Sequence, residues 1–181
     1  MADMANDKEM INELTYGEKD LHTLTAKLVF SYIPKEMPAK EVKKKFHEER
    51  GKAKGYEFAF NYAGNASTIQ RNFGLTAEKA NNIYNSYMSG FNGLKAYIDL
   101  RKKDWWEKGY INLNPKVGFK ANIYDYPYLK KVQESFSEPG FWEYYREMKA
   151  VDRHCSTVEK VTEFFKRRAA SDRQSVNYPM K

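Results

Sequence analysis

The chain has 181 residues, of which 41% are hydrophobic and 30% charged, a balance typical of one soluble globular domain. It has no run of the roughly 20 apolar residues that a membrane helix needs, and its first residues lack the basic and apolar regions of a signal peptide. With Cys155 as its single cysteine it has no internal disulfide, so we expect a cytoplasmic protein with no membrane partner. The net charge of +7 favours an anionic partner such as nucleic acid or nucleotides.

The first third of the chain has the pattern of several helices. Helical spacing of apolar residues covers 3–16. Asp20 is a typical N-cap and predicts a helix over 21–32, which Pro34 would end. Pro38 suits the first turn of a further helix, which leads through charged residues into the next segment.

A long helix is predicted in the middle of the chain, over 77–108. Thr76 is its expected N-cap, and apolar residues follow at helical spacing. Gly90 and Gly93 are positions where this helix can bend. Gly109 is its expected C-terminal stop.

The remainder combines a hairpin with a final helix. Residues 110–124 alternate and contain Asn-Pro and Gly, which predicts a short β-hairpin. Residues 125–150 are rich in Tyr, Trp, Pro and Glu and receive no assignment. Residues 151–173 have the pattern of a basic helix. The predicted fold class is therefore mainly α.

The segment 50–64, "RGKAKGYEFAFNYAG", carries the clearest functional pattern. Residues four apart on a helix form one ridge, about 18 Å long here, of Arg50, Lys54, Phe58 and Tyr62. Two cations followed by two rings match a nucleoside triphosphate laid along the helix, with its phosphates at the N-terminal end. Beside this ridge runs a stripe of small residues: Gly51, Gly55, Ala59 and Ala63. Because glycine costs a helix about 1 kcal/mol relative to alanine, this stripe indicates a close approach.

Spacing alone also permits a simpler interpretation of this segment. Arg, Lys and aromatic residues at four-residue spacing are common on half-exposed amphipathic helices. The small residues would then serve tight packing against a neighbouring helix.

The ridge residues together resemble a known motif. R-x-x-x-K-x-x-x-F-x-x-x-Y is the motif of the O-helix in the fingers of family A DNA polymerases, with Ala63 here in place of the family's Gly. "EKDLHTLTA" is similar to the family's G-x-D-I-H-x-x-T-A segment, and "RAASDRQSVNYPMK" to its R-x-A-x-x-R-x-x-x-N-x-P-x-Q segment. The segment that begins "LTAEKANNIYNSY" resembles the helix pair behind the O-helix. Phages are the expected source, because their polymerases are common divergent members.

The resemblance implies a role for each matching residue at the nucleotide. Arg50 would bind the outer phosphates of the incoming dNTP, and His22 would contact the triphosphate. Lys54 would bind phosphate and is the candidate general acid for the departing pyrophosphate. Phe58 would lie on the sugar and discriminate against dideoxynucleotides. Tyr62 would stack near the template base.

The resemblance also implies contacts with DNA. Arg173 and Asn177 match family residues that touch the primer-template near the active site. Lys181 stands where the family usually has Gln, and is expected to lie near the same DNA. His47, His154 and Cys155 match nothing in the family, and they form no metal-site pattern.

The expected organisation follows from this alignment of motifs. Its parts are 1–49 (helices leading from palm to fingers, with an exposed basic loop), 50–64 (O-helix), 65–109 (helical remainder of the fingers), 110–150 (hairpin and lineage-specific insertion) and 151–181 (helix returning toward the palm).

The carboxylates that would hold catalytic metal are expected outside this chain. In the family, Mg²⁺ is bound by Asp residues of a D-Y-S and an H-D-E motif, and neither motif is present. Asp3 and Asp7 are expected on a helix surface instead. We therefore expect a polymerase fragment that binds dNTP and primer-template DNA, needs the palm and thumb segments as partners, and is inactive by itself.

Two alternatives stay open at this point. The chain could be a free-standing basic module that binds nucleic acid or docks on a polymerase, without binding dNTP. It could also be an unrelated helical protein, which failure of residues 50–62 to form one helix would favour.

Overall fold

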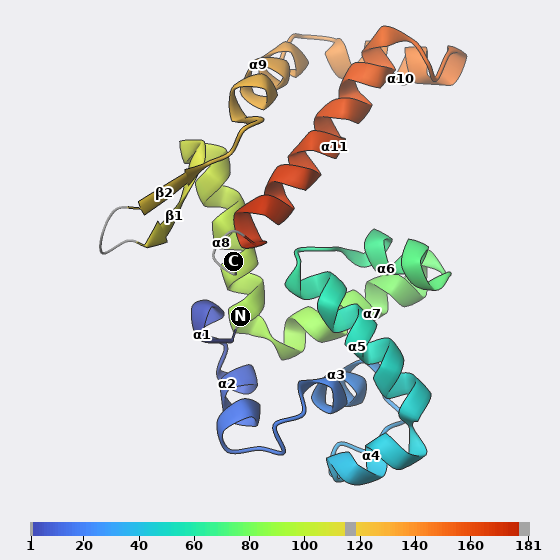
Figure 1. Cartoon of the computed structure of the whole chain (residues 1–181). Coiled ribbons are helices and arrows are strands. Elements are labelled where there is room, and N and C mark those ends of the chain that lie inside the picture. The colour runs from blue at the N-terminus through green and yellow to red at the C-terminus, as the bar shows by residue number, and fades with distance from the viewer. Residues whose placement is uncertain (1, 115–118, 178–181) are drawn as a thin grey trace. The chain divides into compact units, whose positions relative to one another are not determined.

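The computed structural model describes residues 2–114 and 119–177. Its elements in chain order are α1 (Ala2–Ala5), α2 (Lys8–Thr15), α3 (Leu21–Val29), α4 (Ala39–Lys45), α5 (His47–Asn61), α6 (Ala66–Phe73), α7 (Ala77–Gly90), α8 (Asn92–Lys108), β1 (Tyr110–Asn114), β2 (Phe119–Asn122), α9 (Tyr126–Phe136), α10 (Phe141–Val151) and α11 (Ser156–Asn177). The predicted mainly α class with one short hairpin is confirmed (Figure 1). The elements form two compact units, Met1–Leu100 and Arg101–Lys181.

The first unit is built around α5 and α3. These two helices pack against each other, and α3 also packs against α7 (Figure 1). Small and branched side chains fill the space near α4: Ala26, Ile33, Val42 and Ala53. Further along α5, the Phe60 ring lies 5.0 Å from that of Tyr87, which lies 4.8 Å from Phe91. One side of α5 therefore packs in the core, and the ridge residues lie on its other side.

Three predicted helix boundaries are confirmed. Asp20 caps α3, because its Oδ1 accepts the backbone N–H of Thr23 at 3.1 Å. Thr76 caps α7 by accepting the N–H of Lys79 at 3.3 Å. Gly109 ends α8 with φ +78°, in the left-handed region that glycine adopts readily. Local cap chemistry therefore sets these ends.

The first predicted helix, 3–16, is wrong as one element. It forms α1 and α2, separated at Asn6, whose φ is +47°. Asp7 is 1% exposed, so its expected surface position is also wrong. Its Oδ1 accepts the N–H of Met10 at 3.1 Å and its Oδ2 that of Leu94 at 2.9 Å. One carboxylate thus caps both α2 and α8, which explains why it is buried.

The long helix predicted over 77–108 is broken into α7 and α8. The break lies at Phe91, with φ −123° and ψ 69°. A Cβ on Gly90 would come within 2.6 Å of Leu28 Cδ1, and one on Gly93 within 2.6 Å of Asp7 Cα. Both glycines therefore allow another segment of the chain to pack closely against them. The helix was expected to bend at these positions, and it is instead interrupted.

Alanine substitutions at two glycines should have opposite effects. Gly93→Ala should lower the free energy of unfolding by about 1–3 kcal/mol, because its Cβ meets backbone that cannot move aside. Gly51→Ala should raise it by about 0.5–1 kcal/mol, because no atom lies within 4 Å of its Cβ and alanine favours the helix. Urea unfolding measures both variants. A stabilising Gly93→Ala would contradict the packing described.

The second unit combines the confirmed hairpin with the end of α8 and with α9, α10 and α11. β1 and β2 pair antiparallel, with Tyr110 opposite Asn122. α11 lies beside α9 (Figure 1). The core consists of Trp105, Ile111, Ile123, Leu129, Val132, Phe136, Val161 and Phe164. The unassigned residues 125–150 thus form α9 and α10.

The final helix starts later than predicted. α10 continues to Val151, and Asp152 Oδ1 then accepts the N–H of His154 at 2.8 Å. This turn separates α10 from α11, which begins at Ser156. The prediction of one helix from residue 151 was therefore wrong at its start.

Candidate functional site

α5 presents the predicted ridge on one face of a single helix. Arg50, Lys54 and Phe58 lie within the helix, and Tyr62 follows directly as its C-cap. Phe58 is 50% exposed and Tyr62 49% exposed, whereas Tyr56 and Phe60 are buried. The rings of the ridge are thus available to a ligand, and the rings between them belong to the core.

The small residues of the stripe differ in what surrounds them. A Cβ on Gly55 would come within 2.5 Å of Phe73 Cζ, so this position is needed for tight packing. Nothing lies within 4 Å of a Cβ on Gly51. Ala63 has φ +57°, the conformation that the glycine of the motif adopts at little cost. The simpler packing interpretation therefore explains Gly55 and leaves Gly51 without a contact.

Arg50 is held by the start of α3. Its Nη2 lies 2.9 Å from Asp20 Oδ1, and its Nε donates to Asp20 Oδ2 and to Thr23 Oγ1, each at 3.2 Å. The two charged side chains are 22% and 17% exposed, respectively. The carboxylate that caps α3 thus also fixes the guanidinium on α5, through Nε and Nη2 and not through Nη1.

The Asp20–Arg50 pair should make the free energy of unfolding depend on pH. Burial by itself raises the pKa of Asp20, but hydrogen bonds from Arg50 and Thr23 outweigh it and hold this pKa below its ordinary value. The pair therefore stabilises the fold above the unfolded pKa, about 3.9, and this contribution is lost as pH falls through the lower folded pKa. We expect the free energy of unfolding to fall less steeply below pH 4 in Asp20→Asn than in the unmodified chain. Urea unfolding at several pH values tests this, and equal slopes would contradict it.

His22 is held by a carboxylate from α5. Its Nδ1 lies 2.7 Å from Oε2 of Glu57, which is 7% exposed. Thr25 Oγ1 donates to the same oxygen at 3.5 Å. Because a carboxylate accepts hydrogen bonds, Nδ1 carries the proton in this contact and Nε2 is left for a ligand.

Sequence reasoning missed Glu57, although a signal was present. It lies on the buried side of α5, four residues after Ala53 and three before Phe60. A carboxylate among core positions is unusual unless it has a partner. The partner is His22, which could be found only once α3 and α5 were placed together.

His22 and Arg50 line one surface cavity of about 480 Å³, together with Leu14, Glu18, Lys19, Asp20, Leu21, Lys43 and Glu57. Its three carboxylates are engaged, because Glu18 Oε2 accepts the N–H of Ala39 at 2.6 Å while the other two hold Arg50 and His22. Lys19 and Lys43 have no carboxylate partner within the part of the chain that the structure describes. These two ammonium groups are therefore available to an anion, although the formal charges of the lining cancel.

Lys54 and Phe58 extend this site along α5. The Lys54 Nζ lies 5.8 Å from the centre of the Phe58 ring. The His22 ring centre is 6.2 Å from that of Phe58. Four of the five predicted nucleotide-binding residues are thus neighbours, and Tyr62 follows at the end of the helix.

The predicted DNA-binding residues lie in the last part of the chain. Arg173 is exposed on α11. Asn177 is the last residue of α11. Lys181 lies outside the described residues, so its expected position stays a prediction.

Neither a metal cluster nor a membrane span occurs in the described parts of the chain. Residues 2–114 and 119–177 contain no group of three or more His, Cys, Asp or Glu side chains placed to hold a metal ion. Asp20 and Glu57 do not fit as Mg²⁺ ligands, because each is engaged by a basic side chain. No helix in these ranges has the length and apolar character to cross a bilayer.

Comparison with known proteins gives a family match over most of the chain. A sequence model of DNA polymerase family A matches residues 1–118. DNA polymerase I of Bacillus subtilis (strain 168) is 27% identical over 111 residues, which are 61% of this chain and 12% of that protein. DNA polymerase I of Lactococcus lactis subsp. lactis (strain IL1403) is 29% identical over 111 residues, with the same two shares. The chain thus spans about an eighth of the length of these relatives.

A solved structure extends the likeness in fold. The POL domain of Pol1 from M. smegmatis, in complex with DNA primer-template and dNTP, has a TM-score of 0.62 and 19% sequence identity to this chain. The likeness covers 98% of this chain and 24% of that one. It includes residues beyond 118, where the family match ends, and it shows a shared fold.

Proposed function

Since the chain belongs to DNA polymerase family A, we propose that it forms the nucleotide-binding fingers of a DNA-directed DNA polymerase, with α5 as the O-helix. The observation that carries this proposal is the meeting of His22 and Arg50, from two helices, at one cavity whose carboxylates are engaged while Lys19 and Lys43, among the residues that the structure describes, are not. Lys54 and Phe58 continue the same surface. This arrangement supports binding of a dNTP from its phosphates to its sugar.

The phosphate end would be bound by Arg50, His22 and Lys54. Arg50 offers a planar fork to a phosphate and Lys54 a compact charge, whereas His22 offers Nε2. Full use of the guanidinium fork requires phosphate oxygens to replace Asp20, which now occupies Nε and Nη2. In the assembled enzyme Lys54 is the candidate general acid, which would give its Nζ proton to the departing pyrophosphate.

The sugar and base would meet the two rings of the ridge. Phe58 lies one helical turn after Lys54 and is half-exposed, so the face of its ring is available to a sugar. In this position the Phe58 side chain would discriminate against dideoxynucleotides. Tyr62, where α5 ends, would stack near the template base. Arg173, Asn177 and Lys181 remain proposed contacts to primer-template DNA.

The chemical step would need partner segments. Phosphoryl transfer in this family requires Mg²⁺, and we propose that its carboxylate ligands belong to palm segments outside this chain. Primer extension tests the proposal with the chain alone, the palm and thumb segments alone, and their mixture. Extension by the mixture only is expected. Extension by the 181-residue chain alone would contradict the proposed lack of activity.

A second candidate function rests on the ion pair between Arg50 and Asp20. Because Asp20 occupies much of its guanidinium, the phosphate site is partly closed, which favours a basic nucleic-acid-binding or polymerase-docking module without dNTP binding. Titration with single-stranded DNA at increasing salt separates the two functions. Binding that falls steeply with salt and ignores added dNTP would favour the second.

Glu57 provides a specific test of the dNTP site. Glu57→Ala should weaken dNTP binding roughly threefold to tenfold, because His22 loses the hydrogen bond that orients its ring. Glu57→Gln keeps an oxygen acceptor for Nδ1 and should retain most of the affinity. Glu78→Ala, an exposed acid of α7, serves as the control in the same calorimetric titration. Equal losses in the Gln and Ala variants would contradict this role.

A further inference from the structure

A second cavity lies on the opposite side of α5 from the ridge. It has a volume of about 620 Å³, is open to solvent, and is lined by the end of α3 and the residues that follow it, by α5, by the end of α6 and by α7. Lys52 and Tyr56 face it from α5, each two residues after a ridge position and so about 200° around the helix. Its volume is within the range of roughly 300–1,000 Å³ found for small-molecule sites.

The walls of this rear cavity are mainly aromatic and apolar. Phe30, Tyr56 and Phe73 contribute rings, and the Tyr56 and Phe73 rings meet edge to face at 4.8 Å. Gly55 lets Phe73 lie directly on α5, because a Cβ there would come within 2.5 Å of its ring. The cavity therefore offers aromatic and apolar surface to a ligand.

A polar group in the wall lacks a protein partner. Tyr56 is 2% exposed, and no described residue forms a hydrogen bond with its hydroxyl. Burial raises the pKa of this hydroxyl. The hydroxyl oxygen itself is not fully buried, so water or a ligand in the cavity can form a hydrogen bond with it.

The charge of the wall has one sign. Lys52 and Lys79 line the cavity, and neither forms an ion pair with any residue that the structure describes. No acidic side chain lines it. Glu49 lies near, but it accepts a hydrogen bond from the Tyr32 hydroxyl at 3.1 Å and is not part of the wall. A ligand with negative charge would thus be complementary.

We propose that the rear cavity binds a small organic anion with a flat aromatic body, held by Lys52 and Lys79 at its charged end. This site is separate from the proposed dNTP site and does not depend on it. The probe is 2-naphthoate, with the neutral 2-naphthalenemethanol as a compound of similar shape. Calorimetric titration of the 181-residue chain should show saturable one-to-one binding of the naphthoate and at least about tenfold weaker binding of the alcohol.

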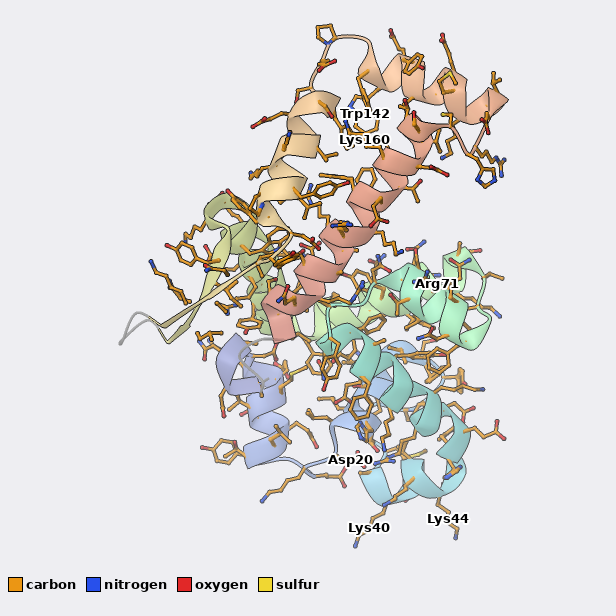
Figure 2. The ribbon with its side chains drawn as sticks, turned by 45° about the horizontal axis from the view of Figure 1, so that its top comes forward. Asp20, Lys40, Lys44, Arg71, Trp142 and Lys160 are labelled. Carbon is orange, nitrogen blue, oxygen red and sulfur yellow. The ribbon has the colours of Figure 1, made fainter. Side chains whose placement is uncertain are left out.

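Two pairs of lysine substitutions locate the charge effect. Lys52→Gln with Lys79→Gln should lower naphthoate affinity about tenfold and leave the alcohol unchanged. Lys40→Gln with Lys44→Gln removes the same charge from α4, where Figure 2 shows both side chains pointing away from the helix, and should change neither affinity. Circular dichroism confirms that each variant is folded. Absence of saturable naphthoate binding, or equal losses in the two pairs, would overturn the proposal.

Discussion

Replacing Arg50 with alanine should weaken dNTP binding by the chain about tenfold to a hundredfold. The estimate follows from the loss of charge-assisted hydrogen bonds to phosphate, each worth about 1.5–3 kcal/mol. Arg50 is suited to this role because Asp20 and Thr23 already hold its guanidinium at the cavity that His22 shares. Arg50→Lys keeps the charge but loses the fork, so we expect an intermediate loss.

The control for this prediction is Arg71→Ala. Arg71 is an exposed arginine of α6 with no ion-pair partner among the described residues, and Figure 2 labels it. Its substitution removes the same charge and should leave dNTP affinity unchanged. Fluorescence titration with a labelled dNTP measures all three variants, and thermal melts show whether each is folded. Equal affinities of folded Arg50→Ala and Arg71→Ala would contradict the dNTP site and favour the nucleic-acid module.

The site could be predicted from the sequence where its residues lie on one helix. Arg50, Lys54 and Phe58 share a face of α5 because their spacing matches the helical repeat. The contacts that hold the site connect different elements. No local pattern reveals that Asp20 caps α3 and also pairs with Arg50, or that Glu57 holds His22.

The same division applies to the fold. Asp20, Thr76 and Gly109 mark helix ends through their own side chains or backbone, so local reasoning found them. The break at Phe91 depends on segments that approach from elsewhere, because Gly90 meets Leu28. Tertiary contact thus overrides a helical pattern that continues across the break.

Residues 125–150 carry a helical signal in the sequence, although they received no assignment. In α9 the buried residues Leu129, Val132 and Phe136 keep helical spacing. Pro127 near the start of α9 is also a typical helix-start signal, and Gly140 directly precedes α10. Local patterns do not reveal how the two helices pack, which depends on the rings of Phe136 and Phe141, stacked with their centres 4.8 Å apart.

Asp7→Ala should lower the free energy of unfolding by about 2–4 kcal/mol, because two helices lose their caps at once. Each oxygen of Asp7 accepts the N–H of the third residue of a helix, Met10 in α2 and Leu94 in α8. The negative charge also lies at both positive helix ends. A loss of this size is a large part of the roughly 5–15 kcal/mol that stabilises an ordinary domain.

Two further variants separate capping from a general effect of charge. Asp3→Ala removes an exposed acid from α1 and should change stability by less than about 0.5 kcal/mol. Asp7→Asn keeps one acceptor oxygen but turns an amide NH₂ toward the second N–H, so it should restore less than half of the loss. Urea unfolding, followed by circular dichroism, measures the series. If Asp7→Ala matched Asp3→Ala, or if Asn restored full stability, a single carboxylate would not be joining α2 to α8.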